Sequence, residues 1–157
     1  MRKQYYEYRH VVGFEETNLV GNVYNVNYAR WQDRCREMFL LEHAPGVLDE
    51  LSDDLVLRPI ESQCEYLAEA CAFDEVSIRM RLEELTQTQI GFVFDVVRVR
   101  EGVEDLIARC RQRVACMRDI DGVVTPAPVP PQLASELRAY AIAPATNPRG
   151  RGTGGRA

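Results

Sequence analysis

The chemistry open to this chain is concentrated in an asparagine-rich turn, residues 16–25 (ETNLVGNVYN), that precedes a helix-forming segment. The carboxamide of Asn18 can donate a hydrogen bond or orient a water molecule, but it cannot take up a proton at neutral pH. Backbone N–H groups at the start of a helix attract an anion or a developing oxyanion. The turn therefore favours oxyanion stabilisation without a general base. The alternative for Asn18 is structural, with its side chain bonded to the backbone of its own turn.

Two side chains beyond the turn could also reach a substrate. Arg36 falls beside the apolar stripe of the following helix, so its guanidinium is expected to be partly buried and to need an anion or carbonyl groups. A salt bridge with Asp33, Glu37 or an acid of a partner chain would explain it equally well. Tyr28 could place its hydroxyl in a cavity, although an aromatic residue at helical spacing usually belongs to the core.

Other chemistries find little support. His10 and His43 do not stand with an acid and a nucleophile at a telling spacing, so both are expected to be packed or surface residues. No G-x-S-x-G motif occurs, which removes support for a serine triad. The five cysteines are odd in number and lack metal-ligand spacing, so we expect reduced core residues, no metal and no cofactor; they are Cys35, Cys64, Cys71, Cys110 and Cys116. The net charge of -5 argues against nucleic-acid binding.

Hydrophobic periodicity predicts the elements that position the turn. Residues 4–15 alternate as a strand, and apolar positions recur at three and four over residues 25–41, with an Asn as a reasonable helix cap. Strands are predicted at 55–67, 75–85, 89–100 and 105–117, and a short amphipathic helix at 132–140. One long helix can cover only one face of such a sheet, so we expect a homo-oligomer.

The length of 157 residues allows a single domain, predicted at residues 1–141 and followed by a disordered basic tail at 142–157. No stretch approaches the roughly 20 apolar residues of a membrane span, and the N-terminus lacks the apolar segment of a secretory signal. The expected location is cytoplasmic.

The order of these elements resembles the hotdog fold over roughly residues 4–140: an α+β fold in which a five-stranded antiparallel sheet wraps around one long central helix. Within it, the chain resembles the 4-hydroxybenzoyl-CoA thioesterase branch, whose turn reads D-x-x-G-x-V and leads into N-x-x-Y-x-x-W/F-x-E. Here the turn is NLVGNV at residues 18–23, and Tyr28, Trp31 and Asp33 occupy the matching places.

Two positions depart from the branch. Asn18 stands where these thioesterases carry their acidic nucleophile or base, and Asn22 stands where many relatives have His. Together with Arg36, this variant pattern resembles the thioesterases that accompany iterative enediyne polyketide synthases. The resemblance implies the catalytic residues Asn18, Arg36 and Tyr28, and the substrate-binding residues Gly21, Asn22 and Asn25, the last as a backbone N–H donor to the oxyanion.

The same resemblance implies a function. The expected reaction is hydrolysis of a β-ketoacyl polyene from a phosphopantetheine arm on the acyl carrier protein domain of a polyketide synthase, followed by decarboxylation. A homotetramer is expected, without nucleic acid or membrane as a partner. Two alternatives stay open: a general acyl-CoA thioesterase, which the missing acid disfavours, and a non-catalytic acyl-binding hotdog module, which the missing acid fits.

Overall fold

A computed structural model describes residues 4–142 of the chain. In chain order its elements are β1 (Tyr6–Val11), the 3-10 turn η1 (Phe14–Glu16), α1 (Val26–His43), α2 (Pro45–Leu51), β2 (Leu55–Tyr66), β3 (Glu75–Leu85), β4 (Gln89–Arg100), β5 (Val103–Ile120), β6 (Val123–Pro126) and α3 (Pro131–Arg138). The predicted tail at 142–157 lies, apart from its first residue, outside the described residues. None of the helices described combines the length and apolar composition that a membrane span requires.

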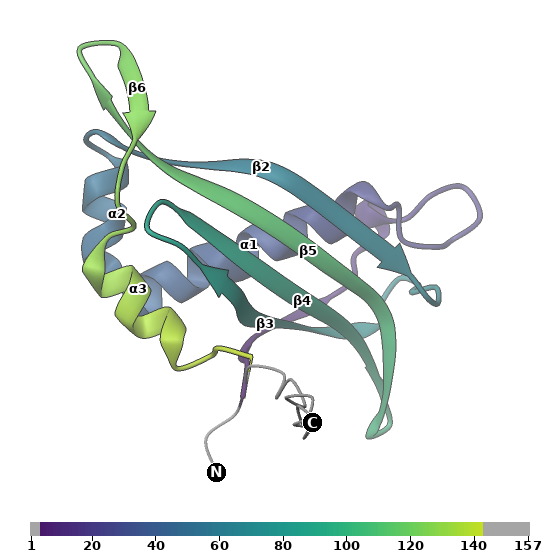
Figure 1. The fold of residues 1–157 in the computed structure, drawn as a ribbon. Coiled ribbons are helices and arrows are strands. Elements are labelled where there is room, and N and C mark those ends of the chain that lie inside the picture. Colours follow the sequence, from purple (N-terminus) through teal and green to yellow (C-terminus); the bar gives the residue numbers. More distant parts are fainter. Residues whose placement is uncertain (1–3, 143–157) are drawn as a thin grey trace, which may run out of the picture.

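All neighbouring strands of the single sheet run antiparallel, in the order β1-β3-β4-β5-β2, and β6 pairs with β5. The sheet curls around α1, the one long helix (Figure 1). This arrangement confirms the predicted α+β hotdog fold. Strands β1 and β2 lie at opposite edges of the sheet, although no other strand comes between them in the sequence. The segment that connects them contains η1, α1 and α2.

The central position of β4 follows from its composition, because residues 90–97 are all buried and, apart from Asp95, carry no polar side chain. Phe92, Phe94 and Val96 face α1 and belong to the main core, whereas Val93 and Val97 are buried outside that core cluster. Such a continuous apolar run is typical of a strand with neighbours on both sides and cover over both faces.

Two tight turns shape the meander. Glu101 and Gly102 have φ values of 49° and 78°, and Asp121 and Gly122 have φ values of 53° and 83°. Positive φ at both central positions is the geometry of a two-residue hairpin turn. The second turn adds β6, a short strand that makes the sheet six-stranded rather than five-stranded as predicted.

Helix α1 buries the predicted stripe against the sheet. Tyr28, Trp31, Cys35 and Phe39 are each at most 3% exposed. The helix ends where Pro45 begins α2, because proline disfavours helical backbone at the preceding residue, here Ala44 with φ -141° and ψ 55°. The predicted strand at 4–15 is shorter than expected, since η1 takes its last residues.

The prediction of five reduced cysteines is wrong for two of them. Cys64 on β2 and Cys110 on β5 face each other directly in the sheet and form a disulfide, with a Cα–Cα distance of 4.1 Å. Cys35 and Cys116 are buried free thiols as expected, whereas Cys71 is free but exposed. The pairing was not visible in the sequence because 46 residues separate the two positions.

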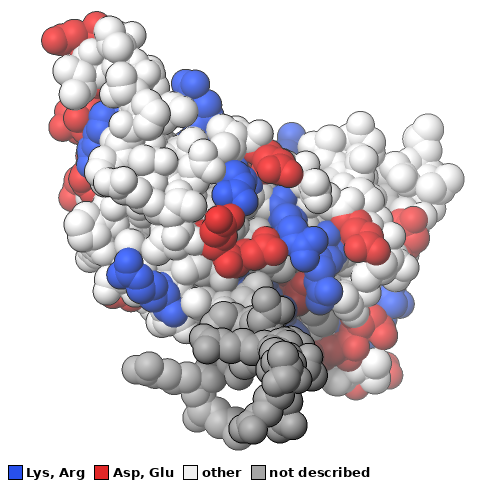
Figure 2. Space-filling view, in the orientation of Figure 1, with Lys and Arg blue, Asp and Glu red and all other residues white. Residues whose placement is uncertain are grey.

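The face of the sheet opposite α1 is covered by charges of both signs (Figure 2). Asp95 on β4 is only 8% exposed and pairs with Arg81 at 2.5 Å and with Arg109 at 2.9 Å. Arg113 likewise pairs with Glu84. Because opposite charges are interleaved, this face offers no single-sign field to an acidic or basic partner.

Candidate active site

The turn at residues 17–24 is held by its own backbone. Asn18 N–H donates to the carbonyl of Asn22 (2.8 Å), and Gly21 N–H donates to the carbonyl of Asn18 (3.0 Å). Gly21 has φ +86°, a left-handed conformation that glycine adopts without strain. An isolated bridge joins Asn22 to Cys71, which fastens the turn to the segment before β3.

The side chain of Asn18 completes this turn and still has a free donor. Its Oδ1 accepts the N–H groups of Val20 (3.1 Å) and Asn22 (3.2 Å), which is the turn-forming role considered as an alternative. Its Nδ2 donates to no residue in the described part of the chain. The oxygen therefore serves the fold, while the exposed amide NH₂ remains available to a substrate.

The N-terminus of α1 lies directly after this turn and has free N–H groups. Asn25 is the N-cap residue, as predicted, but it adopts helical angles and its side chain makes no capping bond. Within residues 4–142, the N–H groups of Asn25 and Val26 have no acceptor, and the first turn of α1 carries no acid. An 18-residue helix with free N–H groups favours a negative charge at this end.

The residue that fixes the entry to the helix is Asn27, which the sequence prediction missed. Its Nδ2 donates to the carbonyl of Glu16 (2.9 Å) and to that of Tyr24 (3.2 Å), and the residue is 4% exposed. These bonds hold both ends of the turn against α1. The sequence offered only a weak signal, an Asn two residues after another Asn.

An acid does stand in this region, but its oxygens are occupied. Glu16 Oε1 accepts the N–H of Gly13 (2.9 Å) and lies 2.6 Å from Nε2 of His10, while Oε2 accepts Trp31 Nε1 (2.6 Å). Burial raises the pKa of Glu16, but these hydrogen bonds from Gly13, His10 and Trp31 outweigh burial and leave the pKa below its usual value. Glu16 is therefore a carboxylate that ties η1 and β1 to α1.

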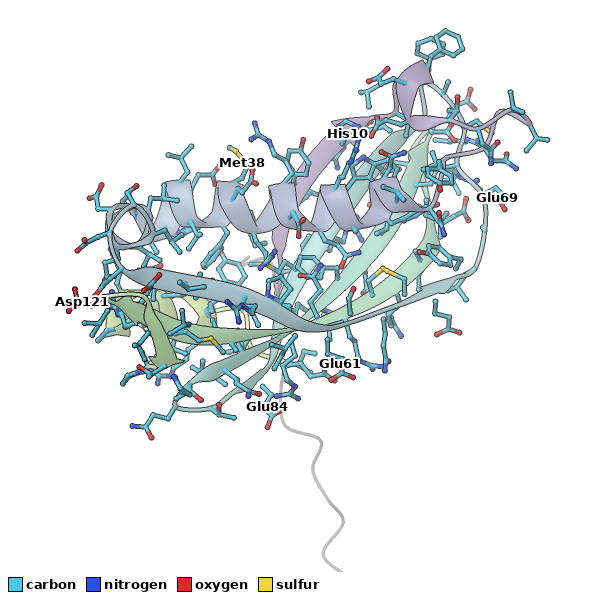
Figure 3. The ribbon with its side chains drawn as sticks, turned by 90° about the horizontal axis from the view of Figure 1, so that it is seen from above. His10, Met38, Glu61, Glu69, Glu84 and Asp121 are labelled. Atoms are coloured by element: carbon cyan, nitrogen blue, oxygen red, sulfur yellow. A yellow bond between two sulfur atoms is a disulfide. The ribbon has the colours of Figure 1, made fainter. Side chains whose placement is uncertain are left out.

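His10 is thus a packed residue, as the sequence suggested, although it does have an acidic partner that the sequence analysis did not find. A carboxylate only accepts hydrogen bonds, so Nε2 of His10 carries the proton. The ring also packs near Trp31, with ring centroids 5.4 Å apart. Figure 3 shows His10 toward the end of α1 where the helix begins. The second histidine, His43, lies at the far end of α1 and packs against Tyr6 and Tyr140.

Tyr28 lies one helical turn into α1 and is buried. Its ring contacts Trp31 and Tyr66, with ring centroids 5.1 Å apart in both pairs. Burial, followed by the nearby Glu69 and Tyr66, raises the pKa of Tyr28 to about 12. No described residue hydrogen bonds to its hydroxyl, which is therefore a neutral donor that a substrate could use.

Arg36 does not join the turn within one chain. It follows Asn25 by eleven positions along the helix, which corresponds to about 16 Å. Its Nη2 donates to Asp33 (2.8 Å), the salt bridge considered from the sequence, while its Nε is buried without a partner among the described residues. Asn18, Gly21 and Asn22 therefore share one turn, and Asn25 and Tyr28 follow it at the start of α1. Arg36 lies about two helical turns beyond Tyr28.

Positions 28, 32, 36 and 40 of α1 form a line facing β2 and β5. Along this line Gln32 donates to the carbonyl of Tyr28 (3.0 Å) and lies beside Cys64, with an Nε2–Sγ distance of 3.4 Å. The stem of Arg36 lines a small apolar cavity of about 30 Å³ with eight other residues, Phe39, Leu40, Leu57, Met80, Ile90, Phe92, Val114 and Leu133. The boundary between this side of α1 and strands β2 and β5, here called the seam, thus runs from Tyr28 to the apolar cavity beside Arg36.

Comparison with known proteins agrees with this arrangement. A family model described as the thioesterase-like superfamily matches residues 12–137, which include the turn, α1 and the whole meander. The chain belongs to this superfamily. Members of the superfamily hydrolyse thioesters, so the protein is a thioester hydrolase.

The dynemicin thioesterase, whose crystal structures concern polyene binding, is 47% identical to this chain. The similarity covers 88% of this chain and 99% of that one, with a TM-score of 0.86. A 1,4-dihydroxy-2-naphthoyl-CoA thioesterase from Synechocystis has the same fold, at 16% identity and a TM-score of 0.76, covering 85% and 96% of the two chains. The 4-hydroxybenzoyl-CoA thioesterase from a Pseudomonas strain also has this fold, at 15% identity and a TM-score of 0.69. That similarity covers 85% of this chain and 96% of the other. Among curated proteins no sequence matches the chain.

Within residues 4–142, no group of three or more His, Cys, Asp or Glu side chains is arranged to hold a metal ion. The polar groups at the turn are instead neutral donors from backbone, amide and phenol. Such donors stabilise negative charge that develops on a carbonyl oxygen.

Proposed function

We propose that this thioesterase hydrolyses a β-ketoacyl polyene from the acyl carrier protein of an iterative enediyne polyketide synthase, and that the released β-keto acid then loses carbon dioxide. The observation that carries the hydrolytic step is a set of free donors in adjoining parts of the chain: the amide NH₂ of Asn18 in the turn, and the N–H groups of Asn25 and Val26 where α1 begins directly after it. The similarity to the dynemicin thioesterase supports the polyene substrate.

In this proposal the thioester carbonyl points at the N-terminus of α1. The N–H of Asn25 and Nδ2 of Asn18 donate to its oxygen as water attacks the carbonyl carbon. Gly21 and Asn22 shape the turn that receives the phosphopantetheine end, and the hydroxyl of Tyr28 donates to the β-oxygen. No general base is positioned, because Glu16 is fully engaged. A missing base commonly forfeits about 10² to 10⁴ in rate, so turnover is slow.

Arg36 enters this site from a second copy of the chain. Within one chain it is about 16 Å of helix away from Asn25, too far to touch the same carbonyl. Its guanidinium reaches the surface toward Asp33, whose side chain is 53% exposed, on the side of α1 that borders β2. The outer edge of β2 pairs with no described strand, and Ile60, Tyr66 and Leu67 are about half exposed there. A homodimer formed along this edge gives hydrogen-bond partners to the unpaired backbone N–H and C=O groups of β2. It also brings Arg36 of one chain toward the site of the other. Two such dimers would form the expected tetramer.

A mixing experiment tests both the reaction and the shared site. Asn18→Ala and Arg36→Ala are each expected to slow release of product from a β-ketoacyl polyene on its carrier protein by about 10² or more. Mass spectrometry follows the product and carbon dioxide. Random heterodimers of the two variants should recover about a quarter of wild-type activity, because half of the dimers are mixed and each mixed dimer keeps one intact site. No recovery would overturn the shared site, because it would show that Arg36 of one chain does not complete the site of the other. An intact acyl chain on the wild-type protein would favour the non-catalytic binding module, and equally rapid hydrolysis of simple acyl-CoA esters would favour a general thioesterase.

A further inference from the structure

The helix and the sheet are joined across the seam by one buried amide pair. Gln112 on β5 donates from Nε2 to Oε1 of Gln32 on α1, at 2.8 Å. Gln32 is 0% exposed and Gln112 is 5% exposed. Phe92 pairs with Gln112 in the sheet, and Val114 follows two positions later; both line the small apolar cavity beside Arg36. The bridge is therefore a buried polar contact next to that cavity.

The hydrogen bonds fix how both amides are oriented. The NH₂ of Gln32 donates to the carbonyl of Tyr28, so the side-chain oxygen of Gln32 faces Gln112. Gln112 therefore donates to that oxygen from its own NH₂. The remaining atom, Oε1 of Gln112, is buried and has no partner in the described part of the chain. A buried amide kept only for stability normally has its acceptor satisfied. The bridge is therefore an incompletely satisfied contact in the free chain.

The bridge also divides the seam into two parts. On one side lie Tyr28 and Tyr66 at the start of α1, and on the other side lies the apolar cavity beside the stem of Arg36. Gln32 is seven positions after Asn25, or about 10 Å along the helix. Since carbon–carbon bonds of about 1.5 Å advance an extended chain by roughly 1.25 Å each, about eight carbons fit before the bridge.

We infer that the Gln32–Gln112 bridge determines acyl-chain length: short chains bind in front of it, and longer chains must separate the two amides to enter the cavity. This inference rests on the proposed function, because it takes the thioester end to lie at the N-terminus of α1. The cavity of about 30 Å³ is too small for a chain in the free protein, so side chains must move when one enters. Gln112, whose oxygen is already unpaired, is the side chain that can turn aside.

The test compares two β-ketoacyl thioesters of N-acetylcysteamine, one with eight carbons and one with sixteen, by release of the thiol. The double variant Gln32→Met/Gln112→Met keeps an unbranched side chain of similar size at both positions and removes the hydrogen bond. We expect its kcat/KM for the longer substrate to rise about fivefold, the equivalent of one net hydrogen bond, and that for the shorter substrate to stay the same. Gln87→Met, at an exposed position in the turn between β3 and β4, is the matched control and should change neither.

Equal changes for both lengths, or none, would overturn the inference. If the double variant fails to fold, Gln112→Asn breaks the bridge by shortening one side chain and should give the same preference. A wild-type protein that hydrolyses neither thioester would refute the proposed function. The inference would then be decided by fluorescence titration with parinaric acid, an eighteen-carbon conjugated acid. It should bind more tightly to the double variant than to the wild type, and as tightly to Gln87→Met as to the wild type; equal binding to all three would overturn the inference.

Discussion

Replacing Asn18 by Asp separates its two roles, because the change keeps one oxygen and exchanges the NH₂ for a second oxygen. In the structure Oδ1 accepts two backbone N–H groups, from Val20 and Asn22, and an aspartate can accept both. Asn18→Asp should therefore leave the turn and the melting temperature unchanged. The lost donor should lower kcat by about 10² to 10³, the usual cost of removing one oxyanion-hole donor.

Asn18→Ala removes the donor and also the two turn bonds. Its kcat should fall to the level of Asn18→Asp, whereas its free energy of unfolding should fall by about 1–2 kcal/mol, since each bond contributes about 1 kcal/mol or less when exposed. The assay is single-turnover release from the carrier protein, with thermal unfolding followed by circular dichroism on the same samples. An Asn18→Asp protein faster than wild type would refute the donor role, because it would show that a carboxylate base is useful at this position.

Two further substitutions test the surroundings of the turn, and a thiol titration tests the cysteines. Glu16→Gln should destabilise the protein at pH 7, and because the folded pKa of Glu16 is lowered, the difference in melting temperature should shrink as pH falls below about 4.3, the ordinary pKa of Glu; a difference independent of pH would contradict the network. Tyr28→Phe should lower kcat with little change in stability, and because the pKa is raised to about 12, the wild-type rate should show no loss from phenol ionisation up to pH 10. Ellman's reagent should titrate Cys71 alone in the native protein, three thiols in guanidinium and five after reduction; five without reduction would exclude the disulfide between Cys64 and Cys110.

The sequence predicted the elements whose signal is local and periodic. The long helix was predicted at 25–41 and is observed at Val26–His43, because its apolar stripe is regular over four turns. Strand β3 was predicted at its observed bounds, since its residues alternate clearly. Strand β6 was missed because all four of its residues are exposed, so no inward face marks it in the sequence.

Contacts between distant segments could not be predicted in the same way. His10, Glu16 and Trp31 meet only once β1, η1 and α1 have packed, and the acid was overlooked although an indole N–H in a core requires a partner. The disulfide likewise depends on the register of β2 against β5. The sequence placed Asn18 and Arg36 in one site, and only the length of the helix between them shows that one chain cannot bring them together.

The placement of the acid explains how a hydrolase turn can function with asparagine. Glu16 and Asn18 are two residues apart, and the turn directs the first toward α1 and leaves the second exposed. A carboxylate at position 16 fixes the start of α1 through Trp31, so the free N–H groups of the helix are held in place before a substrate arrives. Preorganised donors of this kind cost no rearrangement during the reaction, which is why they remain effective when the base is absent. In the proposed function the turn supplies the electrostatic part of thioester hydrolysis without proton abstraction. The rate should then depend on the donors at Asn18 and Asn25 and only weakly on pH near neutrality.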